Sequence, residues 1–331
     1  MRNTFKSTVL AATVLTGLMA ISPGAKANIF TPGDLVVGNY NSSGNYNIAD
    51  YLPSSSGALV LNQNVYLGTF ESAMASTSTS IIYGNFNSDI VYSINQSGVI
   101  STLNTVSGYV SGIQTDANNN IFVSASGGYG SYNIYLTELS STGTVLSTKS
   151  FTLPSAGGTT GTTTTTLSSN ESTLYVHNNG NVYGINTSTG AATELYAYSP
   201  SQGSPMVVLP NGNLLFSNTV NEIQLNPNTG TVVSSTALLN GADSGLAVDT
   251  SNSFVYGANE SSTMITYAPV SNLSSVSTFN TVNAVTYGAT VFGQYTLDSQ
   301  TPAPEPASAV LLVGMLGMLA LAKRVRVRNQ Q

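Results

Sequence analysis

Two stretches of twelve residues share one pattern: GIQTDANNNIFV at residues 112–123 and GLAVDTSNSFVY at residues 245–256. Each has a glycine and a short apolar run before an aspartate, then a polar turn, then a second apolar run. Short β-prone runs bounded by Asn, Ser and Asp predict two strands joined by a tight turn. The stretch MVVLPNGNLLF at residues 206–216 has the same rhythm without the aspartate. The pattern predicts an all-β chain built from related units.

A second motif gives the length of the unit. A turn of the form polar-Ser/Thr-Gly recurs with glycines at Gly98, Gly143, Gly190 and Gly230, which are 45, 47 and 40 residues apart. A period of roughly 40 to 50 residues with four short strands per unit is typical of a β-propeller. Strand-like apolar runs lie at residues 35–37, 90–92, 121–123, 174–176, 214–216 and 254–256. We place units at residues 67–105, 106–153, 156–198, 201–239 and 241–282, and we expect residues 283–300 and 28–66 to form a sixth between them.

The sequence therefore predicts a β-propeller, most simply with six blades, in which one blade joins the two ends of the chain. We expect this closure to remove open sheet edges. Seven blades, a β-solenoid and a pair of sandwiches are the alternatives. The Gly-apolar-Asp phrase resembles that of NHL and SMP-30-like propellers. The resemblance implies a central tunnel, in which SMP-30-like hydrolases hold a metal on converging acids and an Asn; other units here carry residues 168–170 (SSN) or 209–211 (LPN) at that place.

Composition narrows the function classes. Charged residues make up 7% of the 331 residues, against about 25% in an average soluble domain. Between residues 28 and 303 there are 13 Asp and Glu and a single cation, Lys149, which gives that segment a formal charge of −12. Phosphate binding needs clustered Lys and Arg, so nucleic acid is excluded as a partner. The chain has no cysteine, so disulfides and thiolate sites are excluded as well.

Residues 1–27 have the pattern of a signal peptide. Arg2 and Lys6 precede an apolar run at residues 9–21, and Ala25 and Ala27 are the small residues that signal peptidase accepts at positions −3 and −1. We expect cleavage after Ala27. The alternative is an N-terminal helix that stays in the fold.

The C-terminal residues 301–331 have three parts, of which the first is the motif Pro304-Glu305-Pro306. The sixteen uncharged residues 307–322 form a predicted transmembrane helix of roughly 24 Å, somewhat shorter than a ~30 Å hydrocarbon core. Long basic side chains and local thinning of the bilayer make up the difference. By the positive-inside rule, the basic end at residues 323–328 stays in the cytoplasm and residues 28–303 lie on the other side of the membrane. The basic cluster consists of Lys323, Arg324, Arg326 and Arg328.

This tail resembles the PEP-CTERM sorting signal of Gram-negative bacteria. The resemblance covers about the last 28 residues of the chain. It implies that an exosortase recognises Pro304, Glu305 and Pro306, that the helix and the basic end are discarded, and that the protein is associated with exopolysaccharide and biofilm. An ordinary membrane anchor is the alternative, and both interpretations place the body outside the cell.

Few residues are candidates for chemistry in the segment 28–300, which we expect to form the propeller. Asp116 and Asp249 occupy equivalent places in two units, and repeated acids at the mouth of a propeller can bind Ca²⁺. We favour a simpler role, in which each carboxylate accepts backbone N–H bonds and shapes a turn. The only histidine, His177, precedes Asn178, and we expect it to be a solvated side chain at the edge of a turn. We therefore predict no catalytic residue and no cofactor, with Asp116 and Asp249 as weak calcium candidates.

The tyrosines form two predicted groups. Exposed tyrosines can stack on sugar rings, and the candidates are Tyr40, Tyr46, Tyr129 and Tyr132. Tyrosines within strands are expected to pack between blades, namely Tyr83, Tyr92, Tyr175, Tyr183 and Tyr256.

Together these features predict an exported, non-enzymatic binding or structural propeller at the cell surface or in the extracellular matrix. Its partners would be signal peptidase and exosortase during export, then extracellular polysaccharide or other surface proteins, with membrane contact through the terminal segments alone. The alternatives are a secreted hydrolase or lyase acting on sugars or lactones, and a calcium-dependent adhesin.

Overall fold

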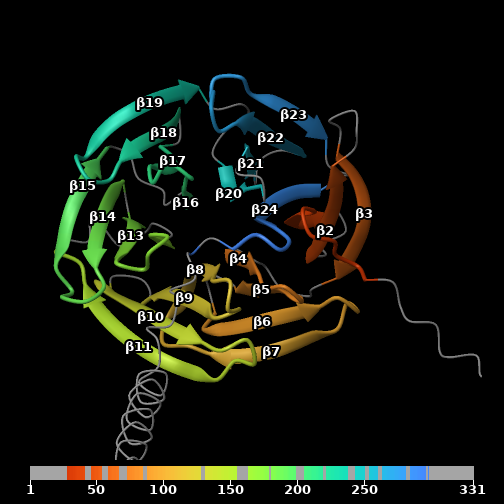
Figure 1. Ribbon diagram of the computed structural model, residues 1–331, viewed down its shortest axis with the longest axis horizontal. Helices are drawn as coiled ribbons and strands as arrows, with labels where there is room; N and C mark the ends of the chain where they lie inside the picture. The colour runs from red at the N-terminus through yellow and green to blue at the C-terminus, as the bar shows by residue number, and fades with distance from the viewer. Residues whose placement is uncertain are drawn as a thin grey trace, which may run out of the picture.

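The computed structural model describes residues 28–41, 46–53, 59–66, 73–84, 88–127, 131–154, 163–178, 180–198, 205–218, 221–237, 243–249, 253–259, 263–280, 284–295 and 297. Within these ranges the chain forms 24 strands and no helix, arranged as six four-stranded antiparallel sheets around a central axis (Figure 1). The all-β class and the six-bladed propeller are therefore confirmed. The predicted signal peptide and the predicted sorting tail lie outside the described residues.

Five blades are continuous in sequence, and each runs from an inner strand to a peripheral one. Blade 1 contains β4 (Ala73–Ser76), β5 (Ser80–Gly84), β6 (Ile90–Asn95) and β7 (Ile100–Thr105). Blade 2 contains β8 (Tyr109–Thr115), β9 (Ile121–Ser126), β10 (Asn133–Leu139) and β11 (Val145–Thr152). Blade 3 contains β12 (Thr164–Leu167), β13 (Thr173–Asn178), β14 (Asn181–Asn186) and β15 (Ala192–Ala197). Blade 4 contains β16 (Met206–Val208), β17 (Leu214–Ser217), β18 (Asn221–Asn226) and β19 (Thr231–Ala237), and blade 5 contains β20 (Asp243–Val248), β21 (Phe254–Asn259), β22 (Met264–Pro269) and β23 (Ser277–Asn280).

The sixth sheet, which we call the closing blade, joins the two ends of the chain. Its inner strand is β24 (Ala284–Val291), and the other three are β1 (Leu35–Asn41), β2 (Tyr46–Pro53) and β3 (Leu59–Tyr66). In the β1–β24 pair Leu35 lies opposite Val291. Each of the six sheets falls within one of the predicted units, and the predicted joining of the ends is confirmed.

The recurring polar-Ser/Thr-Gly motif is the turn between the third and fourth strands of blades 1 to 4. In blade 1, Asn95 Oδ1 accepts the backbone N–H groups of Ser97 (2.9 Å) and Val99 (3.0 Å). The motif's glycines all have positive φ, between 67° and 85°, a region that glycine enters without a steric penalty. Local hydrogen bonding and backbone conformation together therefore explain why the motif recurs.

Two of these turns, at Gly143 and Gly230, pack closely against the blade that precedes them. A Cβ added to Gly230 would lie 2.9 Å from the carbonyl oxygen of Leu195, in the fourth strand of blade 3. At Gly143 an added Cβ would overlap the carbonyl oxygen of Leu103 in blade 1, and Asn104 Nδ2 donates a 2.5 Å hydrogen bond to the Gly143 carbonyl oxygen. The glycine thus has a second role, because it allows neighbouring blades to approach closely.

The core lies between the blades, and the second strand of a blade is buried on both faces. In β9, Ile121 and Val123 pack in a cluster with blade 1, whereas Phe122 packs in a cluster with blade 3. All three side chains are buried. This explains the predicted apolar runs, since five of the six belong to β1, β9, β13, β17 and β21, which are second strands.

Closure of the ring does not remove the sheet edges, so this part of the prediction was wrong. Neighbouring blades are separate sheets, and the fourth strand of each remains an edge. In five of the six blades the pairing with the fourth strand contains a register shift, such as the one between Glu138 and Leu139. Bulges of this kind bend an edge and disfavour pairing with another chain.

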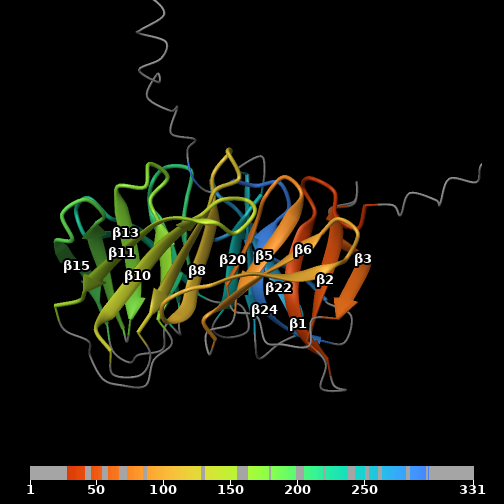
Figure 2. The same cartoon turned by 90° about the horizontal axis from the view of Figure 1, so that it is seen from below.

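The ring has two distinct faces (Figure 2). We call one the turn face; it carries the turns between first and second strands, such as 116–120, and between third and fourth strands, such as 140–144. We call the other the loop face; it carries the connections between second and third strands and between successive blades, and Tyr109 and Tyr132 lie at strand starts on this face.

Candidate functional site

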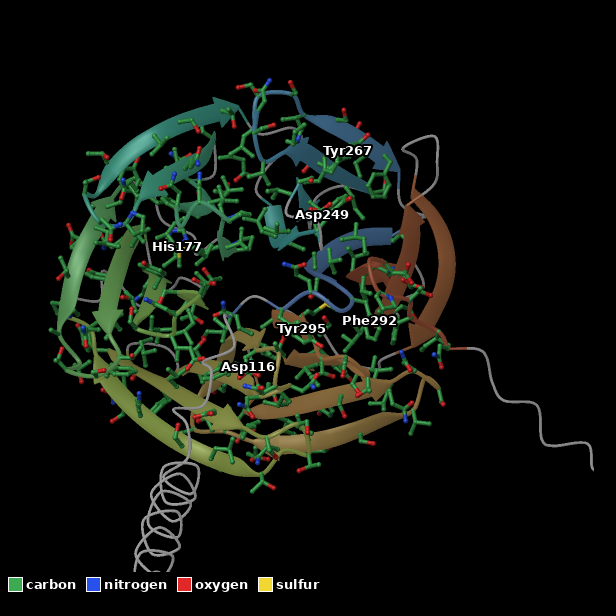
Figure 3. The ribbon with its side chains drawn as sticks, viewed as in Figure 1. Asp116, His177, Asp249, Tyr267, Phe292 and Tyr295 are labelled. Atoms are coloured by element: carbon green, nitrogen blue, oxygen red, sulfur yellow. The ribbon has the colours of Figure 1, made fainter. Side chains whose placement is uncertain are left out.

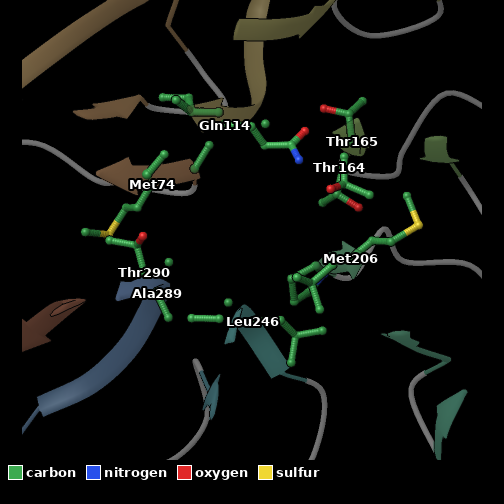
Figure 4. Close-up of a pocket in the computed structure, with 18 of the residues that line it drawn as sticks. Met74, Gln114, Thr164, Thr165, Met206, Leu246, Ala289 and Thr290 are labelled. Atoms are coloured by element: carbon green, nitrogen blue, oxygen red, sulfur yellow. The ribbon is translucent and has the colours of Figure 1, made fainter. Parts of the chain in front are cut away.

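The six inner strands surround an axial channel with an empty volume of about 780 Å³, a value that includes open solvent at its mouth. Figure 4 shows Met74, Gln114, Thr165, Met206 and Leu246 around it. Small, apolar, hydroxyl and amide residues line the channel, and no charged residue is among the described lining residues. The converging acids implied by the SMP-30-like resemblance are therefore not found in that lining.

Asp116 follows the inner strand of blade 2, and its carboxylate is held by its own turn. Oδ1 accepts the backbone N–H groups of Asn118 (2.9 Å) and Asn120 (2.8 Å), and Oδ2 accepts a 3.0 Å bond from Asn120 Nδ2. The side chain is buried. This is the bonding pattern expected for a residue that shapes a turn.

Asp249 has the same role in blade 5, where Oδ1 accepts the N–H groups of Ser253 (2.6 Å) and Phe254 (3.0 Å). Figure 3 shows Asp116 and Asp249 on opposite sides of the channel, so these two carboxylates do not converge. In the part of the chain that the structure describes, no three acidic or histidine side chains are grouped so that they could hold a metal ion.

The prediction for His177 was wrong, because its side chain is fully buried (0% exposed) within β13. Nε2 lies 2.8 Å from the hydroxyl oxygen of Tyr198, and the imidazole packs against Phe216 of blade 4 at 5.4 Å between ring centroids. The Tyr198 hydroxyl also lies 3.3 Å from the carbonyl oxygen of Ser217. Burial, followed by the neighbouring Tyr196, raises the pKa of Tyr198 above its ordinary value. His177 is thus part of an aromatic contact between blades 3 and 4.

The predicted tyrosine groups are largely supported by burial. Tyr83, Tyr175 and Tyr183 are buried and pack between blades, as expected, and Tyr92 and Tyr256 are half-buried. Burial, then the charge of Asp249, raises the pKa of Tyr256 to about 12. Of the candidates for sugar stacking, Tyr132 is 46% exposed and Tyr40 is half-buried. The Tyr46 side chain and Tyr129 lie outside the described part of the chain.

Nothing in the sequence indicated a short segment that follows β24, residues 292–295 and 297, which we call the strap. Ser76 Oγ donates a 3.1 Å bond to the carbonyl oxygen of Val291 and accepts a 3.0 Å bond from the Gly293 N–H. The N–H of Leu297 donates to the carbonyl oxygen of Thr115 (3.2 Å), and its side chain is buried in the cluster between blades 2 and 3. The strap therefore connects the closing blade with blades 1 to 3 on the turn face, beside the channel mouth (Figure 3).

The N-terminal described residues lie on the same face. Asn28 is exposed, whereas the next two side chains, Ile29 and Phe30, are buried. The Ile29 N–H donates to the carbonyl oxygen of Gln96 (3.0 Å) in a turn of blade 1, and Phe30 packs against Phe292 of the strap at 5.5 Å. Both described ends of the domain thus leave from the turn face.

Among the described residues no helix is long and apolar enough to cross a membrane. Residues 307–322, for which we predict a transmembrane helix, lie outside them.

Comparison with known proteins identifies the fold. No family model matches the chain, and no curated protein matches it. A protein of unknown function from Bacteroides caccae is 15% identical, with a TM-score of 0.54, and the alignment covers 78% of this chain and 98% of that one. A chain from the nidogen/laminin complex is 11% identical, with a TM-score of 0.57, and the alignment covers 78% of this chain and 97% of that one. At these identities the similarity establishes the six-bladed β-propeller fold alone, and one fold serves many functions.

Proposed function

We propose that the chain is the precursor of an exported β-propeller that is sorted through its C-terminal tail and functions as a non-enzymatic binding or structural protein outside the cell. The observation that supports this proposal is the position of the two ends. Among the described residues, packing begins at Ile29, two residues after the predicted cleavage site at Ala27, and Leu297 anchors the chain seven residues before Pro304. Both predicted processing signals therefore lie beyond these contacts in the sequence, so cleavage at either one would leave the contacts intact.

The position of the ends also gives the propeller an orientation. Until the tail is removed, a tail that leaves from the turn face holds that face toward the membrane, so the loop face points outward. On the loop face Tyr109 is 39% exposed and Tyr132 is 46% exposed. Aromatic faces bind sugar rings, and a body with a formal charge of −12 repels polyanions. We propose a neutral extracellular polysaccharide as the partner of the loop face.

Neither alternative function is favoured by a specific contact. A hydrolase or lyase of the SMP-30-like kind needs converging acids, and the described channel lining has none. A calcium-dependent adhesin needs carboxylate oxygens directed at an ion, whereas Asp116 and Asp249 accept backbone N–H bonds within their own turns.

Mass spectrometry of the exported protein tests the processing. We expect an N-terminus at Asn28 and loss of the residues that follow the Pro304-Glu305-Pro306 region. Neutral residues in place of Lys323, Arg324, Arg326 and Arg328 should leave the tail unprocessed. Exported protein that retains Gln331 would contradict sorting.

Binding to the loop face is tested with the double variant Tyr109→Ser/Tyr132→Ser. Its matched control is Val145→Ser/Leu146→Ser, which removes side chains of similar exposure (50% and 52%) from the peripheral strand β11. Co-sedimentation with neutral polysaccharide from the producing cells should fall at least tenfold for the tyrosine variant and stay unchanged for the control. Equal binding by both variants would exclude the loop face as the site.

A further inference from the structure

Two carboxyl groups lie buried side by side in the closing blade. Asp34 precedes β1 and is 2% exposed, and Asp50 lies in β2 and is 1% exposed. Asp50 is opposite Val36, two residues after Asp34, so both side chains are on one face of the sheet. The Asp50 side chain lies close enough to the Asp34 carboxyl to affect its pKa. Because an ionised carboxylate has no proton to donate, a hydrogen bond between two carboxyl groups requires that one of them is protonated.

The pair lies where the ends of the chain meet. Asp34 Oδ2 accepts the Thr31 N–H (2.6 Å), and the Asp34 carbonyl oxygen accepts the N–H of Phe292 (2.9 Å), the first residue of the strap. The N–H of Gly33 donates in return to the carbonyl oxygen of Phe292 (2.8 Å). Repulsion at the carboxyl pair therefore acts on the contact that closes the ring.

Apart from the α-amino group that the proposed cleavage would create at the exposed Asn28, the described residues offer few cations to neutralise the pair. Lys149 is the only Lys or Arg between residues 28 and 303, and it lies on β11 at the periphery of blade 2. The titratable groups on the packed elements are Tyr83 and Tyr92 of blade 1 and Tyr295 of the strap. The described side chains of β24 and of residues 28–33 include no titratable group. In the sequence of β3 the only titratable residue is Tyr66. At neutral pH none of these groups supplies positive charge.

We propose that Asp34 and Asp50 share one proton and that this proton keeps the closing blade shut, which makes ring closure sensitive to pH. Two like charges on adjacent buried side chains cannot both be present without a large penalty. The proposal does not depend on export or sorting.

The direction of the effect follows from linkage. Burial raises the pKa of Asp34 above its ordinary 3.8, against the opposing effects of the bonds from Thr31 and Asp50. A carboxyl whose folded pKa is raised contributes its stability at low pH and loses it as pH rises through the folded pKa. One such proton changes the ratio of folded to unfolded protein by up to tenfold per pH unit.

The test is urea unfolding of the mature protein between pH 4 and 9 in EDTA, followed by far-UV circular dichroism. Wild type should lose stability as pH rises. Asp50→Asn keeps the shape and removes the second charge, so its profile should be flatter and its midpoint higher than that of wild type at pH 8. Asp34→Asn keeps a side-chain oxygen that can accept the Thr31 N–H bond, so its stability profile should change in the same way. Having two variants keeps the test possible if one of them does not fold. Asp89→Asn, at an exposed acid of blade 1, is the control and should follow the wild-type profile.

Three results would overturn the proposal. If the profiles of both asparagine variants parallel that of wild type, the pH dependence originates elsewhere. If calcium restores the stability of wild type at pH 8 and EDTA abolishes it, the pair holds a metal ion and not a proton.

A disulfide tests whether the pH dependence arises at ring closure. It joins Val37→Cys and Ala289→Cys, which are paired across β1 and β24. In a chain without other cysteines it should remove the pH dependence, and a cross-linked protein that keeps it would show that closure is not the sensitive step.

Discussion

Substituting Gly143 by alanine should destabilise the ring through the contact between blades 1 and 2. Gly143 has φ of 85°, and Gly212 has φ of 81° but no other atom within 4 Å of an added Cβ. Both substitutions incur the penalty of a left-handed alanine, about 1–2 kcal/mol, together with a smaller gain from restricting the unfolded chain. These contributions cancel in the comparison, so Gly212→Ala is a matched control.

The difference between the two variants measures the packing between blades. At Gly143 the new carbon would overlap the carbonyl oxygen of Leu103 and would lie 3.0 Å from the Cγ atom of Leu103. Forcing a methyl group into a packed contact costs about 1–3 kcal/mol beyond the backbone penalty. For a domain of this size each kcal/mol lowers the Tm by ~2–4 °C. Circular dichroism in urea should show a lower midpoint for Gly143→Ala with an unchanged m value. Equal midpoints for the two variants would refute the idea that the glycine is needed for close approach.

Five further substitutions at four positions test contacts described above, each by urea unfolding. His177→Ala should cost about 2–4 kcal/mol because it leaves a cavity between blades 3 and 4, and Tyr198→Phe, which removes only the hydroxyl, about 1 kcal/mol. A smaller loss for His177→Ala than for Tyr198→Phe would contradict the packing role. Asp116→Ala should cost about 1–3 kcal/mol by leaving N–H groups without their acceptor, and Asp116→Asn less than 1 kcal/mol; sensitivity of wild type to EDTA would instead indicate a metal. Leu297→Ala should cost about 2–5 kcal/mol and increase hydrogen exchange in residues 292–295, and unchanged exchange there would show that Leu297 does not hold the strap.

The propeller was predictable because its repeating signals are local. The glycine turns need positive φ, and the second strands contain continuous apolar runs because neighbouring blades cover both faces. The same double coverage explains the error at His177. In a strand buried on both sides, alternation does not separate inward from outward positions, so the following Asn178 suggested an exposed turn.

The strap and the carboxyl pair were not predictable, because both depend on contacts between residues far apart in the sequence. Ser76 and Val291 are an example. A pairing register between β1 and β2 is needed to bring Asp34 and Asp50 together. The sequence offers one indirect indication of the pair. Because residues 28–303 contain a single lysine and no arginine, an acid that is buried there has few cations to neutralise it.

The closing blade has a kinetic consequence. Synthesis from the N-terminus delivers β1, β2 and β3 first, whereas their inner partner β24 is the last of the described strands to be made. Blades 1 to 5 can condense from neighbouring segments, but the β1–β24 pairing must wait for the whole polypeptide and for a loop of more than two hundred residues to close. Completion of the ring is therefore the slow, late event of folding, and a prematurely terminated chain would leave one edge of β1 unpaired and prone to aggregation.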